Sequence, residues 1–180
     1  MLSDLLILFH ITDVRNRIKL ETVLFSVYYP AVEEAKSHRS KHLWVPKPIA
    51  ITSEGYARFA HVSNFVTNSI FTLGLWTLVG STTIPARVDV PLLDNSPAVL
   101  SSLQAEGKIE DGSDGFPVIV FSHGMASSRT DYTTYCGELA SRGYIVAAIE
   151  HRDGSGPGSM IMGEDGTEKS KVHFDIEDLK

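Results

Sequence analysis

The most regular part of this 180-residue sequence begins with Phe116-Pro117-Val118-Ile119-Val120-Phe121-Ser122-His123-Gly124-Met125. Its continuous apolar run is typical of a strand that is buried on both faces of a parallel sheet. A helical pattern follows, with apolar residues spaced i, i+3, i+4, i+7 and i+8 on one face: Tyr132, Tyr135, Cys136, Leu139 and Ala140. A second apolar run covers residues 144–149. The order strand, loop, helix, strand predicts a crossover between parallel strands, and therefore an α/β fold.

The ends of this helix carry the expected signals. Thr130 is the predicted N-cap, Asp131 suits the positive helix start, and Gly143 stands where a C′ glycine belongs. The second strand, residues 144–149, is expected to form the free edge of an incomplete sheet, where unpaired backbone groups invite aggregation or pairing.

The segments on either side give weaker patterns. Residues 18–29 predict a strand that Pro30 ends, and residues 43–46 a short extended piece. Helical segments are expected between Ser53 and Val79, with Gly80-Ser81 closing them. Residues 82–91 read as extended, residues 94–115 as a surface connection, and residues 154–180 as an irregular, glycine-rich tail. The whole of 1–180 is interpreted as a single partial domain.

The bulk composition is that of a globular domain, with 43% apolar and 21% charged residues. A net charge of −6 argues against a general nucleic-acid binder. The single cysteine, Cys136, allows no intrachain disulfide and is interpreted as a core residue. His38 and His42 are four apart but have no third partner, so no metal site is predicted. No signal peptide or transmembrane segment is predicted, which favours the cytoplasm or a membrane surface without fixing the compartment.

The loop His123-Gly124-Met125 suits the chemistry of ester hydrolysis. In α/β-hydrolases one oxyanion-hole N–H follows the nucleophile and the other comes from the loop after the third strand. Such a donor contributes about 3–4 kcal/mol. The Met125 amide is the candidate donor, with Gly124 allowing a sharp turn. The alternative is that His-Gly is merely a strand-to-helix turn.

A nucleophile elbow, G-x-S-x-G, is expected on the same fold. None of the glycine-flanked serines, Ser113, Ser155 and Ser159, has the required spacing. The nucleophile, and the acid and histidine that follow it in chain order, are therefore expected to be absent. Without a nucleophile, His123, His151 and His173 are interpreted as structural or surface residues.

Several segments together resemble platelet-activating factor acetylhydrolases of the plasma and intracellular type II group, including fungal relatives. They are Val27-Tyr28-Tyr29-Pro30, Leu43-Trp44-Val45-Pro46, Thr82-Thr83-Ile84-Pro85-Ala86, Val118-Ile119-Val120-Phe121-Ser122-His123-Gly124, Arg129, Leu139-Ala140-Ser141-Arg142-Gly143-Tyr144-Ile145-Val146-Ala147-Ala148 and Glu150-His151-Arg152-Asp153. The resemblance covers about residues 20–153. It implies the N-terminal part of an α/β-hydrolase fold, up to the strand after the first crossover helix.

The resemblance also implies a calcium-independent serine esterase without metal or organic cofactor. Such an enzyme removes the short sn-2 acyl group of a phospholipid, acetate in 1-alkyl-2-acetylglycerophosphocholine, through a Ser-Asp-His triad. The residue at the position of Met125 supplies an oxyanion-hole amide. The helical segment before Thr82 can touch lipid, which makes Phe71, Leu75 and Trp76 candidates, although packing on the core is an equal alternative.

The elbow of that family lies beyond the stretch that matches residue 153. We therefore expect this chain to be inactive by itself, whether it is a fragment, a shortened gene product or a remnant. Two alternatives remain open: a non-catalytic lipid-binding or regulatory module, and another α/β-hydrolase esterase of the dienelactone hydrolase or cutinase type.

Overall fold

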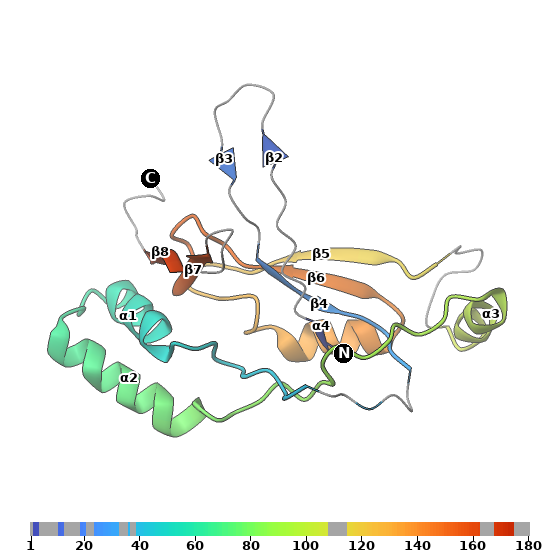
Figure 1. Cartoon of the computed structure of the whole chain (residues 1–180), viewed down its shortest axis with the longest axis horizontal. Helices are drawn as coiled ribbons and strands as arrows, with labels where there is room; N and C mark the ends of the chain where they lie inside the picture. Colours follow the sequence, from blue (N-terminus) through green and yellow to red (C-terminus); the bar gives the residue numbers. More distant parts are fainter. Residues whose placement is uncertain are drawn as a thin grey trace.

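The computed structural model describes residues 2–3, 11–12, 19–20, 24–32, 36, 39–107, 115–162 and 168–174. Its centre is a four-stranded sheet in the order β1-β4-β6-β5, built from β1 (Leu2–Ser3), β4 (Phe25–Tyr28), β6 (Ile145–Ile149) and β5 (Val118–Ser122) (Figure 1). β5 and β6 are parallel, with Val118 opposite Ile145 and Ser122 opposite Ile149. β4 is antiparallel to both β6 and β1. The predicted α/β unit with a parallel strand pair is confirmed.

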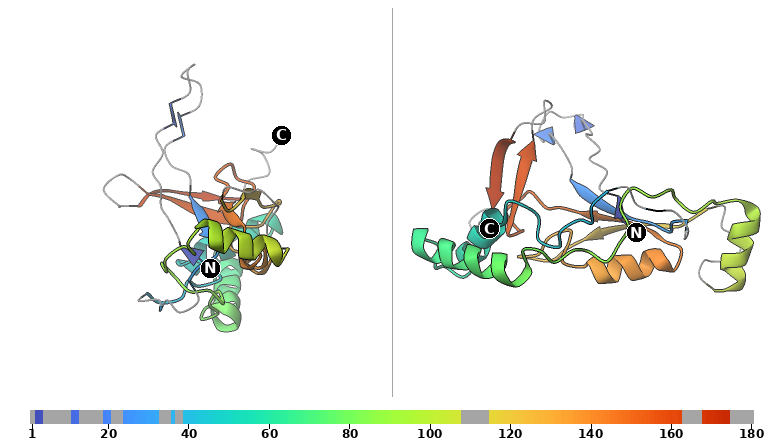
Figure 2. Two further views of the ribbon diagram at one scale, coloured as in Figure 1. Left: turned by 90° about the vertical axis from the view of Figure 1, so that its right-hand side faces the viewer. Right: turned by 60° about the horizontal axis from the view of Figure 1, so that its bottom comes forward.

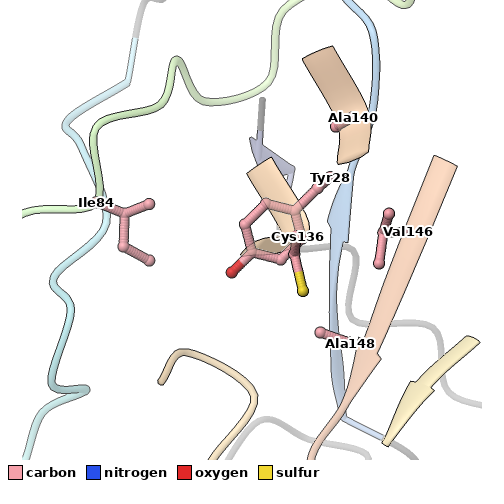
Figure 3. Packing of buried hydrophobic residues seen from close by; sticks show 6 residues of the cluster. All are labelled: Tyr28, Ile84, Cys136, Ala140, Val146 and Ala148. Carbon is pink, nitrogen blue, oxygen red and sulfur yellow. The ribbon is translucent and has the colours of Figure 1, made fainter. Parts of the chain in front are cut away.

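The crossover helix α4 (Thr133–Ser141) joins β5 to β6 and covers one face of the sheet (Figures 1 and 2). Small side chains at Cys136 and Ala140 let the helix approach the strands closely, and Tyr28 packs between them (Figure 3). Gly143 has φ 93°, as predicted for a C′ residue. Thr130 is not the N-cap. The Thr133 N–H donates to the Thr130 carbonyl in a preceding turn, and the helix starts after Tyr132.

The opposite face of the sheet carries no helix in the described part of the chain (Figures 1 and 2). Val118 and Val120 point to that face and are each 66% exposed, whereas Ile119 and Phe121 pack on the core. The expectation that this strand is buried on both faces is therefore wrong. The predicted free edge is also wrong: β6 lies between β4 and β5, and β5 forms the edge.

A helix pair lies beyond one end of the sheet (Figure 1). α1 (Ile49–Phe59) begins after Pro48, earlier than expected, so Ser53 is a buried mid-helix residue that donates to the Ala50 carbonyl. α2 (Phe65–Val79) matches its prediction and is capped by Asn64, whose side chain accepts from Val66 N–H and Thr67 N–H. The two helices pack against each other.

The segment after β6 is more regular than expected. β7 (Gly158–Met162) and β8 (Glu168–His173) form an antiparallel hairpin that packs on α1. Phe174 lies edge-on against Phe59, with ring centroids 5.0 Å apart. Part of the segment that was expected to be an irregular tail thus forms a hairpin that packs against the helix pair.

Two further differences concern the connections. α3 (Pro97–Ala105) lies within the expected surface connection, with Pro97 at its start and Leu100 buried. The expected strand 18–29 contains two: β3 (Lys19–Leu20), which pairs with β2 (Ile11–Thr12), and β4 (Figure 2). Leu43 bridges to Thr83, as expected for extended segments. Among the described residues no helix is long and apolar enough to cross a membrane.

Candidate active-site loop

Two loops meet at the carboxyl ends of the parallel strands, where ligands bind in open α/β sheets. Residues 123–128 follow β5 and residues 150–157 follow β6. The Ala126 N–H donates to the Ser155 carbonyl at 2.7 Å, and the His151 N–H donates to His123 Nε2 at 3.2 Å. The predicted His-Gly-Met loop is therefore held by hydrogen bonds to a loop that the sequence patterns did not connect with it.

The turn is made at Ala126 and not at Gly124. Ala126 has φ 57°, in the left-handed region, whereas Gly124 does not, and a Cβ on Gly124 would meet nothing within 4 Å. The expected role of Gly124 in allowing a sharp turn is therefore wrong. The free space beside Gly124 instead leaves the loop backbone open to an approaching group.

The Met125 N–H is not used by the fold in the described part of the chain. The Met125 residue is 63% exposed, and within the described residues its N–H donates to no protein acceptor. Its neighbours are fixed, because Ala126 is bonded to Ser155 and the Ser127 N–H donates to the Gly124 carbonyl at 3.3 Å. An unpaired N–H on a fixed turn can donate to a developing oxyanion without reorganisation.

A buried ionic cluster of Glu150, Arg129 and His123 packs against the loop. The Glu150 carboxylate, whose side chain is 5% exposed, lies 3.4 Å from Arg129 Nε and 3.7 Å from His123 Nε2. The Arg129 guanidinium also donates to the Ser26 hydroxyl of β4 at 2.5 Å. Burial alone would lower the pKa of His123, but the Glu150 carboxylate and the Gly124 carbonyl raise it above its ordinary value. The cluster ties the loop to β4 and β6.

A second group of polar side chains, in the two loops and at the end of β5, is joined by hydrogen bonds. The Ser122 hydroxyl lies 2.8 Å from His151 Nε2, and His151 Nδ1 lies 2.8 Å from the Ser155 hydroxyl. Ser155 donates from both its hydroxyl and its N–H to Asp153, at 2.5 and 2.9 Å. Burial would raise the pKa of Asp153, but these bonds lower it. The interpretation of His151 as a structural or surface residue did not include these hydrogen bonds, for which the sequence signal was the place of His151 just after β6.

The candidate lipid-contact residues of α2 differ in exposure. Trp76 is exposed, whereas Phe71 and Leu75 are half-buried. Other apolar side chains of the helix are more exposed, with Phe65 87% and Leu78 81% exposed. Other exposed members of this apolar surface are Val66, Ile70 and Leu73. We call these exposed residues, with Phe65, Trp76 and Leu78, the α2 apolar surface.

Other candidate sites stay without support. No group of three or more His, Cys, Asp or Glu able to hold a metal occurs in the described ranges, and His38 lies outside them. Ser113 also lies outside the described residues. Cys136 is buried, which raises the pKa of its thiol to about 11 and keeps it protonated. That agrees with its interpretation as a core residue.

Comparison with known proteins gives matches by sequence and by structure. The family model described as "Platelet-activating factor acetylhydrolase, isoform II" matches residues 10–178. Platelet-activating factor acetylhydrolase of Canis lupus familiaris is 35% identical over 72% of this chain, and that of Cavia porcellus 28% identical over 80%. These alignments cover 23% and 27% of the relatives, so the chain spans about a quarter of their length. A ferulic acid esterase structure from Streptomyces cinnamoneus matches 82% of this chain and 30% of its own, with 20% identity and a TM-score of 0.43.

Proposed function

The chain belongs to the platelet-activating factor acetylhydrolase isoform II family, and from this membership we propose that it forms the oxyanion-binding part of a phospholipid ester hydrolase. The substrate is the sn-2 ester of a glycerophospholipid with a short acyl chain, as in 1-alkyl-2-acetylglycerophosphocholine. The observation that carries the proposal is the free Met125 amide on a fixed turn after β5.

The chemistry follows from that amide. When a nucleophile attacks the ester carbonyl, negative charge develops on the carbonyl oxygen, and an N–H aimed at it lowers the barrier by about 3–4 kcal/mol. The hydrogen bonds donated by the Ala126 and Ser127 N–H groups hold the turn that contains the donor, and the ion pair of Arg129 with Glu150 holds the segment that follows it. Neither the donor nor its supports need a metal or an organic cofactor.

The nucleophile of this reaction has to come from outside the described loop. The 180 residues contain no G-x-S-x-G segment, which the fold uses to present its serine. We propose that this chain alone does not turn over an acetylated phospholipid. Acetate release from 1-alkyl-2-acetylglycerophosphocholine micelles is the measurement, and release above that of a boiled sample overturns this part of the proposal.

The donor itself can be tested without turnover. Hexylphosphonate presents tetrahedral anionic oxygens like those of the intermediate, and we expect it to shift the Met125 amide resonance saturably in ¹H–¹⁵N spectra. The amide resonances of the neighbouring Gly124 and Ala126 should shift with it. Met125→Pro removes the N–H and should abolish the shifts of these two neighbours. Met125→Ala keeps the N–H and should keep them. Equal binding to both variants would contradict the assignment of the donor.

A second candidate function, a non-catalytic lipid-binding module, is favoured by one observation. The α2 apolar surface is far more open than a helix packed on a core, and monomeric proteins seldom expose a large contiguous apolar patch without use. Binding to phosphatidylcholine vesicles in flotation, without acetate release, would support this function. Trp76→Ala should weaken that binding.

A further inference from the structure

The Ser122 side chain has the surroundings of an activated nucleophile. Ser122 ends β5 on the face that carries no helix in the described part, together with Val118 and Val120, and all three are exposed. A reagent can therefore reach its hydroxyl. The partner of that hydroxyl is a ring nitrogen of His151, 2.8 Å away, which is the distance at which a base removes a proton.

The proton positions in the hydrogen-bonded series Ser122, His151, Ser155 and Asp153 follow from the carboxylate at its end. The Asp153 carboxylate can only accept, so the Ser155 hydroxyl donates to it. The same hydroxyl must then accept from His151, which places the ring proton on Nδ1. The lone pair of Nε2 therefore faces Ser122 and accepts its proton. A carboxylate that fixes the tautomer of a histidine base is the arrangement that activates serine nucleophiles, here with one hydroxyl inserted.

The His151 ring is also fixed in orientation. The ring stacks on His123 with ring centroids 3.9 Å apart, and the backbone N–H of His151 donates to His123 Nε2. His123 is in turn held by its Nδ1 bond to the Gly124 carbonyl, 2.9 Å. The base therefore does not have to be ordered when a reagent arrives, which lowers the entropic cost of the reaction.

We propose that Ser122 is a nucleophile activated by His151, with Ser155 and Asp153 as positioning residues, and that it accepts phosphonyl or acyl groups from activated reagents. With a fluorophosphonate, an O–P bond forms from Ser122 Oγ as the P–F bond breaks. The hydroxyl proton moves to His151 Nε2, fluoride leaves, and the imidazolium returns the proton to water. The proposal is independent of the Met125 donor and of phospholipid turnover, because it concerns a different serine from the one an elbow would present.

The test is labelling of the 180-residue chain with a fluorophosphonate probe, followed by intact-mass measurement and peptide mapping. One adduct per chain is expected, on Ser122, and Ser122→Ala should remove it. General-base assistance contributes about a hundredfold or more, so His151→Gln should slow labelling by about that factor while Ser122 remains. Ser155→Ala and Asp153→Asn should slow it less, since they act through His151.

The control is Ser102→Ala, because Ser102 is an exposed serine of α3 beside Glu106 that has no histidine partner in the described part of the chain. The rate and the extent of labelling of that variant should equal those of the unchanged chain. Circular dichroism shows whether each variant is folded. If Ser122→Ala does not fold, the peptide map and His151→Gln decide. An adduct spread over several serines, or labelling of His151→Gln at the unchanged rate, overturns the proposal.

Discussion

Gly55, in the middle of α1, lies directly against the backbone of Pro157. A Cβ built on Gly55 would be 1.4 Å from the Pro157 carbonyl oxygen. Pro157 is fully buried and precedes β7, so this contact is where the helix pair meets the loop after β6. A glycine here permits a close approach of two backbones. The same loop contains Ser155, which accepts the Ala126 N–H and so holds the candidate oxyanion loop.

Gly55→Ala is expected to destabilise the chain by about 3 kcal/mol or more, because overpacking against backbone cannot be relieved by a rotamer change. Urea unfolding followed by circular dichroism measures the free energy of unfolding. Gly74→Ala in α2 is the matched control, since a Cβ there meets nothing within 4 Å. That change should stabilise the helix by up to about 1 kcal/mol. Equal effects of the two substitutions would contradict the packing of α1 on Pro157.

The parts of the fold that the sequence predicted are those with strong local patterns. The apolar runs of β5 and β6 and the spacing in α4 specify each element by itself, and short connections then force a parallel crossover. The helix start at Pro48 and the whole of α3 were missed, because their apolar residues are few and their burial depends on distant partners. The edge position of β5 was missed because β4, which pairs with β6, is more than a hundred residues earlier.

The candidate site divides in the same way. The position of the His123-Gly124-Met125 loop follows from the strand before it, so the sequence could place it. The left-handed residue is Ala126, a residue type that gives no turn signal, and it is held by Ser155 of another loop. The bond between Ser122 and His151 likewise joins residues 29 positions apart that only the parallel pairing of β5 and β6 brings together.

Ala126→Gly should stabilise the chain by about 0.5–1 kcal/mol. The left-handed conformation costs an alanine about 1–2 kcal/mol and a glycine almost nothing, and the greater freedom of an unfolded glycine offsets part of this gain. Chemical denaturation gives the difference. Ala50→Gly, at an exposed position in α1, should instead cost about 1 kcal/mol. A loss of stability in both variants would show that the turn at Ala126 is not formed.

His123 is expected to titrate above its ordinary pKa of about 6.5 because its protonated ring pairs with Glu150. A raised folded pKa means that this pair stabilises the fold fully below about pH 6.5, and that the contribution is lost as the pH rises through the folded pKa. NMR titration of the ring nitrogens measures it. Glu150→Gln should lower the pKa of His123, whereas Glu138→Gln, on the exposed side of α4, should leave it unchanged.

The α2 apolar surface should bind lipid through its most exposed side chains rather than through Phe71 or Leu75. Transfer of a phenylalanine or leucine side chain out of water contributes about 1.5–3 kcal/mol. Phe65→Ser and Leu78→Ser should each weaken binding to phosphatidylcholine vesicles about tenfold, without loss of folding stability. Leu92→Ser, at an exposed leucine away from α2, serves as control in the flotation assay. Undiminished binding in both α2 variants would exclude this surface as the contact.

Val120→Lys is expected to weaken self-association, so that the chain stays monomeric up to a higher concentration. β5 pairs only with β6 in the described sheets, so its outer edge offers backbone N–H and C=O groups to a second strand. Val120 is exposed on the face without a helix, and a lysine there blocks pairing by charge without disturbing Ile119 or Phe121 in the core. Sedimentation velocity at increasing concentration measures association. Val62→Lys, at an exposed valine that follows α1, is the control and should change association little. If both variants associate like the unchanged chain, the β5 edge is not the surface through which copies meet.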